Sequence, residues 1–384
     1  MTIEMLDTEL AADLRRTVRA FLTERCDPGT VAEVYDDPAI ASRELNDGWA
    51  RELGLAGLLV PEADGGAGAS LAEAAVVAHA IGRHAAPLRF LSSGVIATTL
   101  AAHAGDRELA AALAAGERYA AVAFPATSPT LASGLTAATA SGADTARAVP
   151  DPATVHVSGT IAGVMEAAGA DDLIAVLGSG EDTTIVVIDP ADAHIAPFLS
   201  LDETRRLADV TVDSAPARVI ATGAEAVAAV EAATLAGQVA LAAELAGTAA
   251  QAFSTTLDYV RTRVQFGRAI GSYQAIKHRL AELWLAVRQA DAAATYAAQT
   301  AANWQRGEED LHEAQICALT ALAYAAPVAV QATEEAVQLH GGNGMTWEYP
   351  IHLLLKRAKA GELILGHPAA NRAALAALID LPVC

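Results

Sequence analysis

Two short segments of the chain hold residues that could contact an anionic ligand. Arg263 stands in the run RTRVQFG, and an arginine presents a planar fork of donors to phosphate oxygens. Gly341 and Gly342 begin the run GGNG, where the missing Cβ atoms let the backbone approach a ligand closely. Each segment also has a simpler interpretation. Arg263 could be a solvated arginine that favours the C-terminal dipole of a helix, and GGNG could be a helix C-cap turn.

Other common catalytic and binding motifs do not occur in the sequence. No GxGxxG run follows a strand pattern and there is no P-loop, so neither Rossmann-type nucleotide binding nor ATP chemistry is supported. His278 has no second histidine four residues further on, and Cys26, Cys317 and Cys384 form no CxxC pair. We therefore expect no metal site and no disulfide framework. No Ser–His–Asp order stands out as a catalytic triad.

The composition favours a large, acidic, helix-rich globular protein. The chain has 384 residues, of which 53% are hydrophobic and 18% charged, so it has material for two or three domains. Its 46 acidic and 25 basic residues give a formal net charge of −21. That charge repels phosphate backbones and anionic lipids, so we expect no binding to nucleic acid or to a membrane surface.

The sequence contains no pattern that predicts export or membrane insertion. The first residues include acids where a signal peptide needs basic residues, and no apolar segment follows them. The longest apolar stretch lies between Glu313 and Glu334, is rich in alanine and contains several polar residues. A buried helix of a bundle is the better interpretation of it. We therefore expect a cytoplasmic protein.

The chain around the RTRVQFG and GGNG segments divides into three zones. The first zone, residues 1–118, has a helical pattern. Leu14 and Val18 recur at the spacing of an amphipathic helix. Further along, Ser70 is a plausible helix N-cap, with Glu73 completing a capping box. This zone is predicted to be an N-terminal helical domain.

The second zone, residues 119–220, has the pattern of strands. Short β-branched runs are separated by turn residues, with no helical pattern between them, and they cover residues 155–164, 172–177, 183–189 and 208–220. This arrangement predicts a small antiparallel β barrel.

The third zone, residues 221–384, returns to a helical pattern. It predicts helices over Glu225–Arg263, Tyr273–Gln305 and Glu308–His340, and a fourth from Ile351 onward. The first three would each span roughly 45 Å or more at 1.5 Å per residue. Long helices joined by short turns predict an antiparallel four-helix bundle, so the fold class is mainly α with a central β domain.

Four segments, in order, resemble the acyl-CoA dehydrogenase family. They are GWARELGLAGLLVPEADGGAGASLAEAAVVAHAIGR, VSGTIAGVMEAAGADDLIAVL, RTRVQFGRAIGSYQAIKHRLAELW and VQLHGGNGMTWEYPIHLLLKRAKAGELILGHP. The resemblance covers nearly all of the chain. It implies the family's fold, an acyl-CoA substrate, FAD as cofactor, and an electron-transfer flavoprotein or similar acceptor as partner.

The resemblance also implies which residues would bind FAD across a subunit interface. In the family, one subunit holds the flavin ring and its neighbour holds the pyrophosphate and adenosine. Carried over, Arg263 would pair with the pyrophosphate and Phe266 would line the adenine site. The remaining contacts implied by the resemblance are Gln265, Gln274, Gln338, His340, Gly341 and Gly342.

The chain departs from the family at the catalytic base. The family needs a carboxylate to take the α-proton of the thioester, and its usual position falls on Leu365, which cannot abstract a proton. A second position used by some relatives falls near Gly237, which is not acidic either. The nearest carboxylates are Glu244, two helical turns from Gly237, and Glu362, three residues before Leu365. For both, an ordinary exposed or ion-paired glutamate is the simpler interpretation.

The segments that hold the flavin ring in the family are eroded as well. The loop that usually supplies a glutamate and hydroxyl groups has only Thr127 and Ser128, and the Trp–Thr pair is replaced near residues 162–164. The family resemblance therefore implies a companion subunit of a heterotetramer, which completes the FAD site of a paralogous catalytic chain. Two alternatives remain: a self-sufficient homo-oligomeric enzyme with Glu244 or Glu362 as a relocated base, and a non-redox member acting as a scaffold or on another CoA ester.

Overall fold

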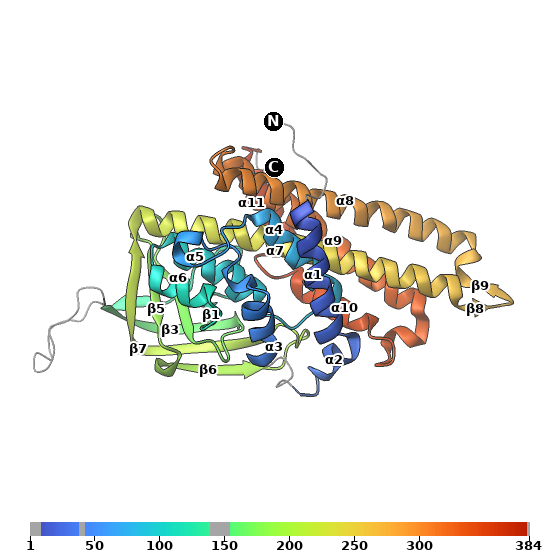
Figure 1. Ribbon diagram of the computed structural model, residues 1–384, viewed down its shortest axis with the longest axis horizontal. Coiled ribbons are helices and arrows are strands. Elements are labelled where there is room, and N and C mark those ends of the chain that lie inside the picture. Colours follow the sequence, from blue (N-terminus) through green and yellow to red (C-terminus); the bar gives the residue numbers. More distant parts are fainter. Residues whose placement is uncertain (1–8, 38–42, 139–153, 382–384) are drawn as a thin grey trace, which may run out of the picture.

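The computed structural model describes residues 9–37, 43–138 and 154–381, and its elements follow the predicted order (Figure 1). Short helices come first, strands follow, and long helices form the last part, which confirms a mainly helical protein with a central β domain. The N-terminal helices are α1 (Glu9–Arg25), α2 (Pro28–Glu33), α3 (Arg43–Asp47), α4 (Leu71–His84), α5 (Thr98–His103) and α6 (Arg107–Ala114), with a π-helical segment η5 (Phe90–Ala97) before α5.

Helices α1 and α4 form as the sequence predicts. Val18 and Leu22 of α1 are buried, so this helix has the expected apolar face. At the start of α4, Ser70 Oγ accepts from the N–H of Ala72 at 3.2 Å, and the Ser70 N–H donates to Glu73 Oε2 at 2.9 Å. The predicted capping box is therefore confirmed.

The β domain contains one larger sheet in the order β1-β4-β5-β7-β3-β2, with β6 also paired to β7. All its pairs are antiparallel, as expected, except β1 and β4, which run parallel. The predicted runs all form strands, whereas β1, β2 and β6 had no clear sequence pattern. The strands are β1 (Ala120–Val122), β2 (Thr136–Ala138), β3 (Thr154–Met165), β4 (Asp172–Leu177), β5 (Thr184–Ile188), β6 (Ala193–Phe198) and β7 (Leu207–Thr222).

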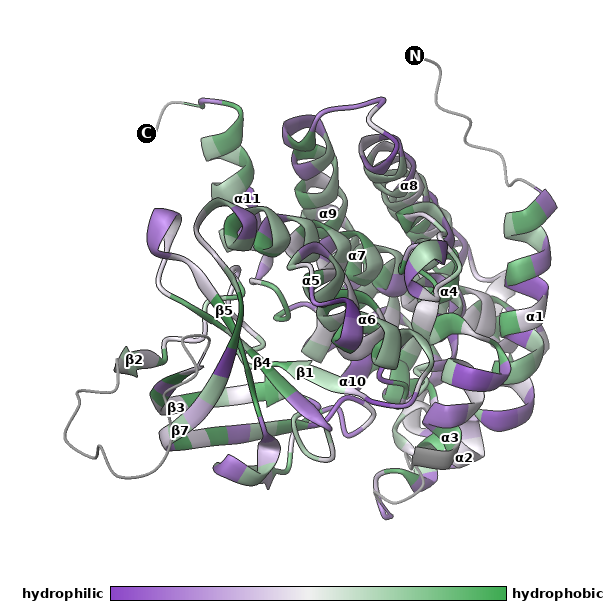
Figure 2. Cartoon of the chain, turned by 60° about the vertical axis from the view of Figure 1, so that its left-hand side comes forward, coloured by the Kyte–Doolittle hydropathy of each residue, from purple (hydrophilic) through white to green (hydrophobic). Residues whose placement is uncertain are grey.

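The C-terminal bundle is arranged around α7, which contacts α4, α8 and α9 along its length (Figure 2). Its 40 residues span about 60 Å at 1.5 Å per residue. The three long helices begin and end within three residues of the predicted positions. The elements are α7 (Gly223–Thr262), a β8–β9 hairpin (Val264–Gln265 and Arg268–Ala269), α8 (Gln274–Gln305), α9 (Leu311–His340), α10 (Ile351–Gly361) and α11 (Pro368–Leu378).

The predicted fourth helix is divided into α10 and α11. Leu365 adopts a φ of +55°, in the left-handed region that a helix excludes, and Gly366 follows with a φ of +93°. The helical segments Gly223–Thr262 and Leu311–Met345 are long and apolar enough to cross a membrane by length and composition. However, 72% and 61% of their most apolar windows are buried inside the protein, as in the core helices of a soluble protein.

Helices α4 and α7 approach each other closely because glycines lie at their contact. A Cβ atom on Gly82 would lie 1.9 Å from the carbonyl oxygen of Glu244, and one on Gly247 would lie 2.1 Å from that of His79. The Thr248 hydroxyl donates to the Gly82 carbonyl at 3.1 Å across the same contact. Any larger residue at either glycine must push the two backbones apart.

We therefore expect Gly82→Ala and Gly247→Ala each to lower the free energy of unfolding by about 1–3 kcal/mol or more, because overpacking forces a backbone shift. Chemical denaturation of the purified chain measures this change. Gly342→Ala is the matched control, since a Cβ there meets nothing within 4 Å. Wild-type stability in both helix variants would contradict the close contact.

Candidate functional site

The ends of α7 and α9 meet at one end of the bundle and bring the two predicted binding segments together. The rings of Tyr259 and His340 stack with their centroids 4.1 Å apart, and the Tyr259 hydroxyl donates to the His340 carbonyl at 3.3 Å. Asn343 Nδ2 donates to the Tyr259 hydroxyl at 3.3 Å. Because Arg263 follows α7 directly and Gly341 follows α9 directly, both segments lie at this nucleotide end, as we call it.

Beyond α7 the chain turns back in the β8–β9 hairpin, which projects past the bundle (Figure 1). Phe266 and Gly267 form its turn, with φ values of +51° and +79°, and the Phe266 ring is 94% exposed. The guanidinium of Arg268 covers the ring of Tyr273 at 3.8 Å. The ring is therefore available for contact with a ligand or with another chain.

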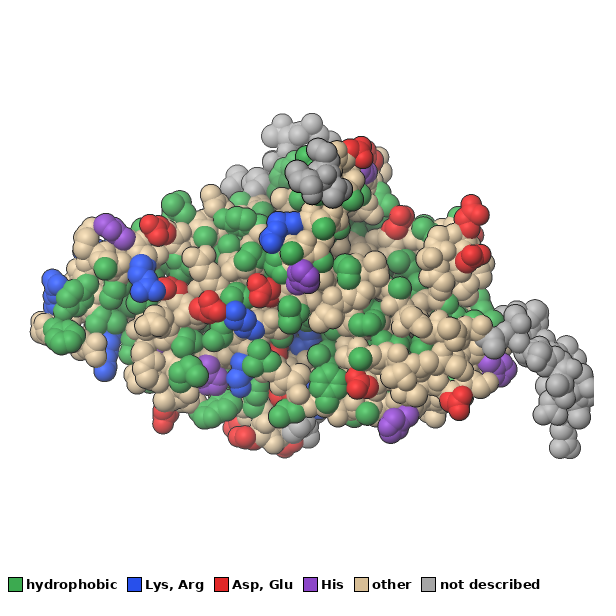
Figure 3. All heavy atoms as spheres, turned by 180° about the vertical axis from the view of Figure 1, so that it is seen from behind, with side chains coloured by type: hydrophobic (Ala, Val, Ile, Leu, Met, Phe, Trp, Pro, Cys, Tyr) green, Lys and Arg blue, Asp and Glu red, His purple; other side chains and the backbone are tan. Residues whose placement is uncertain are grey.

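The surface of the nucleotide end is rich in basic and apolar side chains, in contrast to the acidic chain as a whole (Figure 3). Arg263 is exposed, and its guanidinium has no hydrogen bond or ion pair within the described part of the chain. Arg261 and Arg268 are exposed beside it. These donors are therefore available to the oxygens of an anionic ligand.

The other predicted contacts are also at the surface, with one exception. Gln265, Gln274, Gln338, Gly341 and Gly342 are exposed or partly exposed. A Cβ atom on Gly342 would meet nothing within 4 Å and its φ is not positive, so no contact within the described residues requires a glycine there. A ligand that approaches the backbone would explain it, and the residues of this end fit the pyrophosphate and adenosine of FAD.

His340 is the exception, because its side chain is buried beneath the turn. Its Nδ1 lies 2.7 Å from the carbonyl oxygen of Ala336, and burial lowers its pKa. The neutral ring therefore supports the turn through its stack with Tyr259. A direct contact of this ring with a phosphate would need a rearrangement.

The two positions at which the family carries its base lie against each other, one on α7 and the other just after α10. A Cβ atom on Gly237 would lie 3.0 Å from Leu365 Cδ1 and 3.0 Å from Ile96 Cγ1. Leu365 and Ile96 are both buried. The space beside these positions is therefore filled with hydrocarbon, which can neither take a proton nor stabilise a charge.

The segments implied to hold the flavin ring meet at this same point. The Leu365 N–H donates to the Ala126 carbonyl at 2.9 Å, and the Ala126 N–H donates to the Gly163 carbonyl at 3.0 Å. The 125–130 loop, the 162–164 segment and the base position are thus joined through backbone hydrogen bonds. The hydroxyl of Ser128 lies 3.3 Å from that of Thr130 within the loop. The three segments that the resemblance assigns to the flavin ring and the base are thus brought together, whereas the family's glutamate and its Trp–Thr pair are absent from them.

Glu244 lies at the centre of a buried ionic cluster. Its carboxylate accepts from Arg205 Nη2 at 2.7 Å and from Arg357 Nε at 2.9 Å, and Arg357 Nη1 also reaches Asp202 Oδ2 at 3.3 Å. Burial alone would raise the pKa of Glu244, but the two arginines outweigh it and hold the pKa below its usual range. This geometry favours a structural role for Glu244, because a stabilised carboxylate is a weak base.

Glu362 lies just beyond the end of α10. Although Glu362 is only three residues before Leu365, the two do not share a helical face, because the helix ends at Gly361 and Leu365 has left-handed backbone angles. The Glu362 side chain is half-buried and has no hydrogen bond within the described part of the chain. Its role as a base stays an untested prediction.

Another buried carboxylate, Glu166, was not found from the sequence. It follows β3 with a φ of +54° and accepts a short hydrogen bond from the Ser92 hydroxyl. Burial raises its pKa, although Arg89 and Arg205 act in the opposite direction. The Arg89 guanidinium donates to the carbonyls of Glu166 and Ala168 at 3.1 and 2.7 Å. The acid in MEAAG directly after a strand was the only available sequence signal.

We expect Glu244→Gln to lower the free energy of unfolding by about 3–5 kcal/mol, because it leaves two buried arginines without their charged partner. Urea denaturation at neutral pH measures the change, and Glu362→Gln is the control that should alter stability by less than about 0.5 kcal/mol. Because the folded pKa of Glu244 is lowered, its contribution is present at neutral pH and is lost as the pH falls through that pKa. Full stability of Glu244→Gln would contradict the structural role.

Comparisons with known proteins find matches for both helical parts of the chain. Residues 8–116 match the acyl-CoA dehydrogenase N-terminal domain, and residues 227–379 match the acyl-CoA dehydrogenase C-terminal domain. The acyl-CoA dehydrogenase IpdE2 of Mycolicibacterium smegmatis is 31% identical over 92% of this chain and 94% of its own length. FadE34 of Mycobacterium tuberculosis is 32% identical over 80% of this chain, which spans 38% of that longer protein.

Solved structures share the whole fold. A variant of the Tcur3481-Tcur3483 steroid ACAD aligns with a TM-score of 0.82 and 26% identity, over 97% of this chain and 98% of that one. The ChsE4-ChsE5 complex from Mycobacterium tuberculosis aligns with a TM-score of 0.84 and 23% identity, over 99% and 100%. The matches of both domains and of a relative along nearly its full length show that this chain belongs to the acyl-CoA dehydrogenase family, a family of FAD-binding flavoproteins.

Proposed function

We propose that this chain is a companion subunit that completes the nucleotide half of the FAD site of a catalytic partner chain and supplies no base of its own. The observation that carries this proposal is the contact between Gly237 and Leu365, where both base positions of the family lie in hydrocarbon. An alkyl side chain cannot take the α-proton of an acyl-CoA thioester. A carboxylate of the partner chain would therefore abstract the proton.

The proposed reaction is the α,β-desaturation of an acyl-CoA thioester. Bound FAD supplies the acceptor for the hydride that leaves the β carbon. On this chain, the free guanidinium of Arg263 would contact the pyrophosphate, and the exposed ring of Phe266 would cover the adenine. The backbone at Gly341 and Gly342 would approach the nucleotide without steric hindrance. These residues bind and orient the cofactor, and none of them moves a proton.

The neighbours with two named components support a paralogous partner chain. Both the ChsE4-ChsE5 complex and the Tcur3481-Tcur3483 enzyme carry two protein names, and the latter is described as a steroid ACAD. We therefore propose a heterotetramer, or another hetero-oligomer, that acts in the cytoplasm on the CoA ester of a lipid, with a steroid as the favoured acyl group. An electron-transfer flavoprotein or a similar acceptor would take up the electrons.

The test compares this chain alone, a catalytic paralogue alone, and the two co-expressed. We expect the chain alone to lack flavin absorbance and acyl-CoA oxidation, and the co-purified complex to have both. Arg263→Met and Phe266→Ala in this chain should each lower the FAD content of the complex, because they remove its contacts with the nucleotide tail. FAD is measured by absorbance after denaturation, and activity by reduction of an artificial acceptor.

The matched control for Arg263 is Arg16→Met, which changes an exposed arginine of α1, on another part of the chain, paired with Asp13. Normal FAD content is expected in this variant. Glu362→Gln should leave the activity of the complex unchanged. Flavin binding and oxidation by the chain alone would instead establish a self-sufficient enzyme with a relocated base, if turnover is lost in Glu362→Gln or in a Glu244→Gln variant that keeps its fold and its bound flavin.

A further inference from the structure

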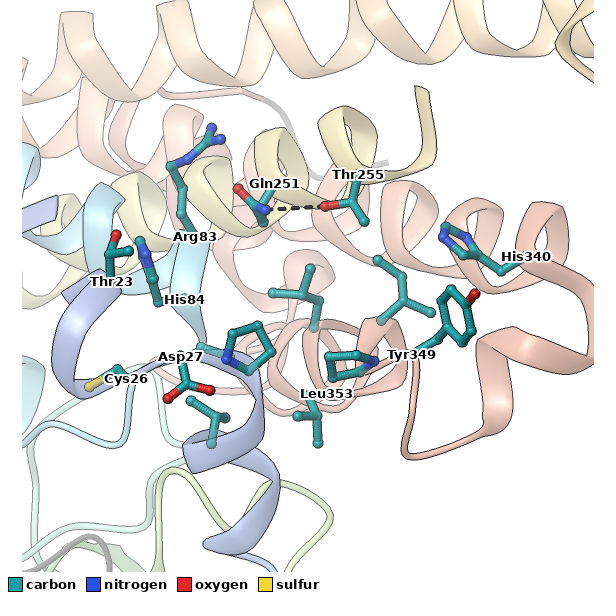
Figure 4. A pocket seen from close by; sticks show the side chains of 16 residues that line it. Thr23, Cys26, Asp27, Arg83, His84, Gln251, Thr255, His340, Tyr349 and Leu353 are labelled. Atoms are coloured by element: carbon teal, nitrogen blue, oxygen red, sulfur yellow. Dashed lines mark hydrogen bonds between the residues drawn. The ribbon is translucent and has the colours of Figure 1, made fainter. Parts of the chain in front are cut away.

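A cavity of about 320 Å³ lies between the N-terminal helices and the bundle, away from the base positions (Figure 4). Its walls come from α1 and α2, the end of α4, the second half of α7, and the start of α10, and His340 and Tyr349 of the nucleotide end close one side. On α7 it is lined by Gln251 and Thr255, which lie about 20 Å or more from Gly237 along the helix axis. The cavity is therefore a separate site from the catalytic centre of the family.

The lining of this cavity is mainly apolar. Val31, Ala85 and Leu353 contribute to its walls, and it has the size of a small-molecule pocket. The carboxylate of Asp27, although at the edge, is already occupied, because it caps α2 through the N–H of Gly29 at 2.8 Å. An apolar body of modest size would gain free energy by leaving water for this space.

Arg83 contributes to the lining of this cavity and of a second one of about 620 Å³, so the two cavities meet at its side chain. In Figure 4 its side chain rises from the rim of the smaller cavity, away from His84. The larger cavity lies between α1, α4 and α8 and is strongly basic. Its charged lining residues are Arg15, Arg19, Arg83, Arg288 and Arg306 against Glu73 and Asp291.

The acids of the larger cavity are engaged by other groups. Glu73 belongs to the capping box of α4, and Asp291 accepts from Arg288 at 3.0 Å and lies 3.2 Å from His79 Nε2. Arg19 and Arg83 have no hydrogen bond or ion pair from their guanidinium groups within the described residues. Two free guanidinium groups therefore face one cavity in a chain with a net charge of −21.

Without a bound anion, the surroundings of Arg83 disfavour the positive charge of its guanidinium group. Its side chain is half-buried, and burial lowers its pKa; the like charge of Arg19 lowers it further, while Asp291 acts in the opposite direction. An anion placed between the two guanidinium groups would relieve the repulsion and accept several charge-assisted hydrogen bonds. The adjacent apolar cavity could hold the rest of the same molecule.

We propose that these joined cavities bind an amphipathic anion, with a carboxylate or phosphate head on Arg19 and Arg83 and an apolar body in the smaller cavity. The anionic head would lie between α1 and α4, in a cavity lined by none of the residues proposed to contact FAD, so this site goes beyond the proposed function. Its test can fail while the companion-subunit proposal holds, and the reverse is also possible.

The test is calorimetric titration of the purified full-length chain with decanoate, decyl phosphate, decanol and inorganic phosphate, each below the concentration of micelle formation. We expect saturable one-to-one binding of decanoate or decyl phosphate, at least tenfold tighter than that of decanol and of inorganic phosphate. Comparing the two anions identifies the head group. Binding of inorganic phosphate as tightly as decyl phosphate would overturn the amphipathic ligand.

Two variants test the two halves of the site. Arg83→Gln should weaken binding of the anion by about 10–100-fold and leave decanol unaffected, because it removes a charge-assisted contact. Thr255→Phe should abolish binding of both by filling the apolar cavity. Arg16→Gln on the same helix as Arg19 is the matched control and should bind normally.

Circular dichroism checks the folding of each variant. If Arg83→Gln does not fold, Arg19→Gln replaces it, since Arg19 is exposed on α1. The proposal is overturned by a wild-type chain that binds neither amphipathic anion, or by binding that survives both the arginine and the cavity substitutions.

Discussion

The buried ionic cluster around Glu244 is the interaction on which the arrangement of the three parts depends. Glu244 belongs to α7, Arg205 to the segment before β7, and Arg357 to α10, while the Tyr35 hydroxyl after α2 donates to Asp202 of the same cluster at 3.3 Å. Each of these charges would cost several kcal/mol if it were buried alone. The β domain and the bundle must therefore come together before all of these charges are compensated, and the Tyr35 hydroxyl joins the helical domain to the same cluster.

Close backbone packing places this cluster, and the same packing shapes the base positions. Gly82 fits against the carbonyl of Glu244, and a Cβ atom on Gly361 would lie 2.8 Å from Leu245 Cδ2, so both α4 and α10 lie close to α7. Two turns earlier on α7, Gly237 leaves room only for Leu365 and Ile96. An acid placed there would need space for a substrate and for its own hydration, and this close packing supplies neither.

Local patterns in the sequence predicted much of the fold, because local contacts determine them. The Ser70–Glu73 capping box spans four residues, and the long bundle helices follow from their alanine-rich periodic patterns. The partners of Glu244 lie 39 and 113 residues away, so its ionic cluster left no pattern in the sequence. The helix break at Leu365 was missed for a similar reason, since its N–H bonds to Ala126 in the β domain. The nucleotide end could be proposed from motifs, but the meeting of its two segments required the Tyr259–His340 stack.

The contrast between the two halves of the family site is the strongest indication of a division of labour. At the nucleotide end, Arg263 has free donors and Phe266 is almost wholly exposed, so both are available to a ligand or to another chain. At the base positions, Leu365 and Ile96 are buried in mutual contact with Gly237 and need no further partner. The nucleotide end is thus open to another molecule, whereas the base positions leave no space for one. A chain that carried out the oxidation by itself would require the opposite arrangement, with an open space beside a carboxylate.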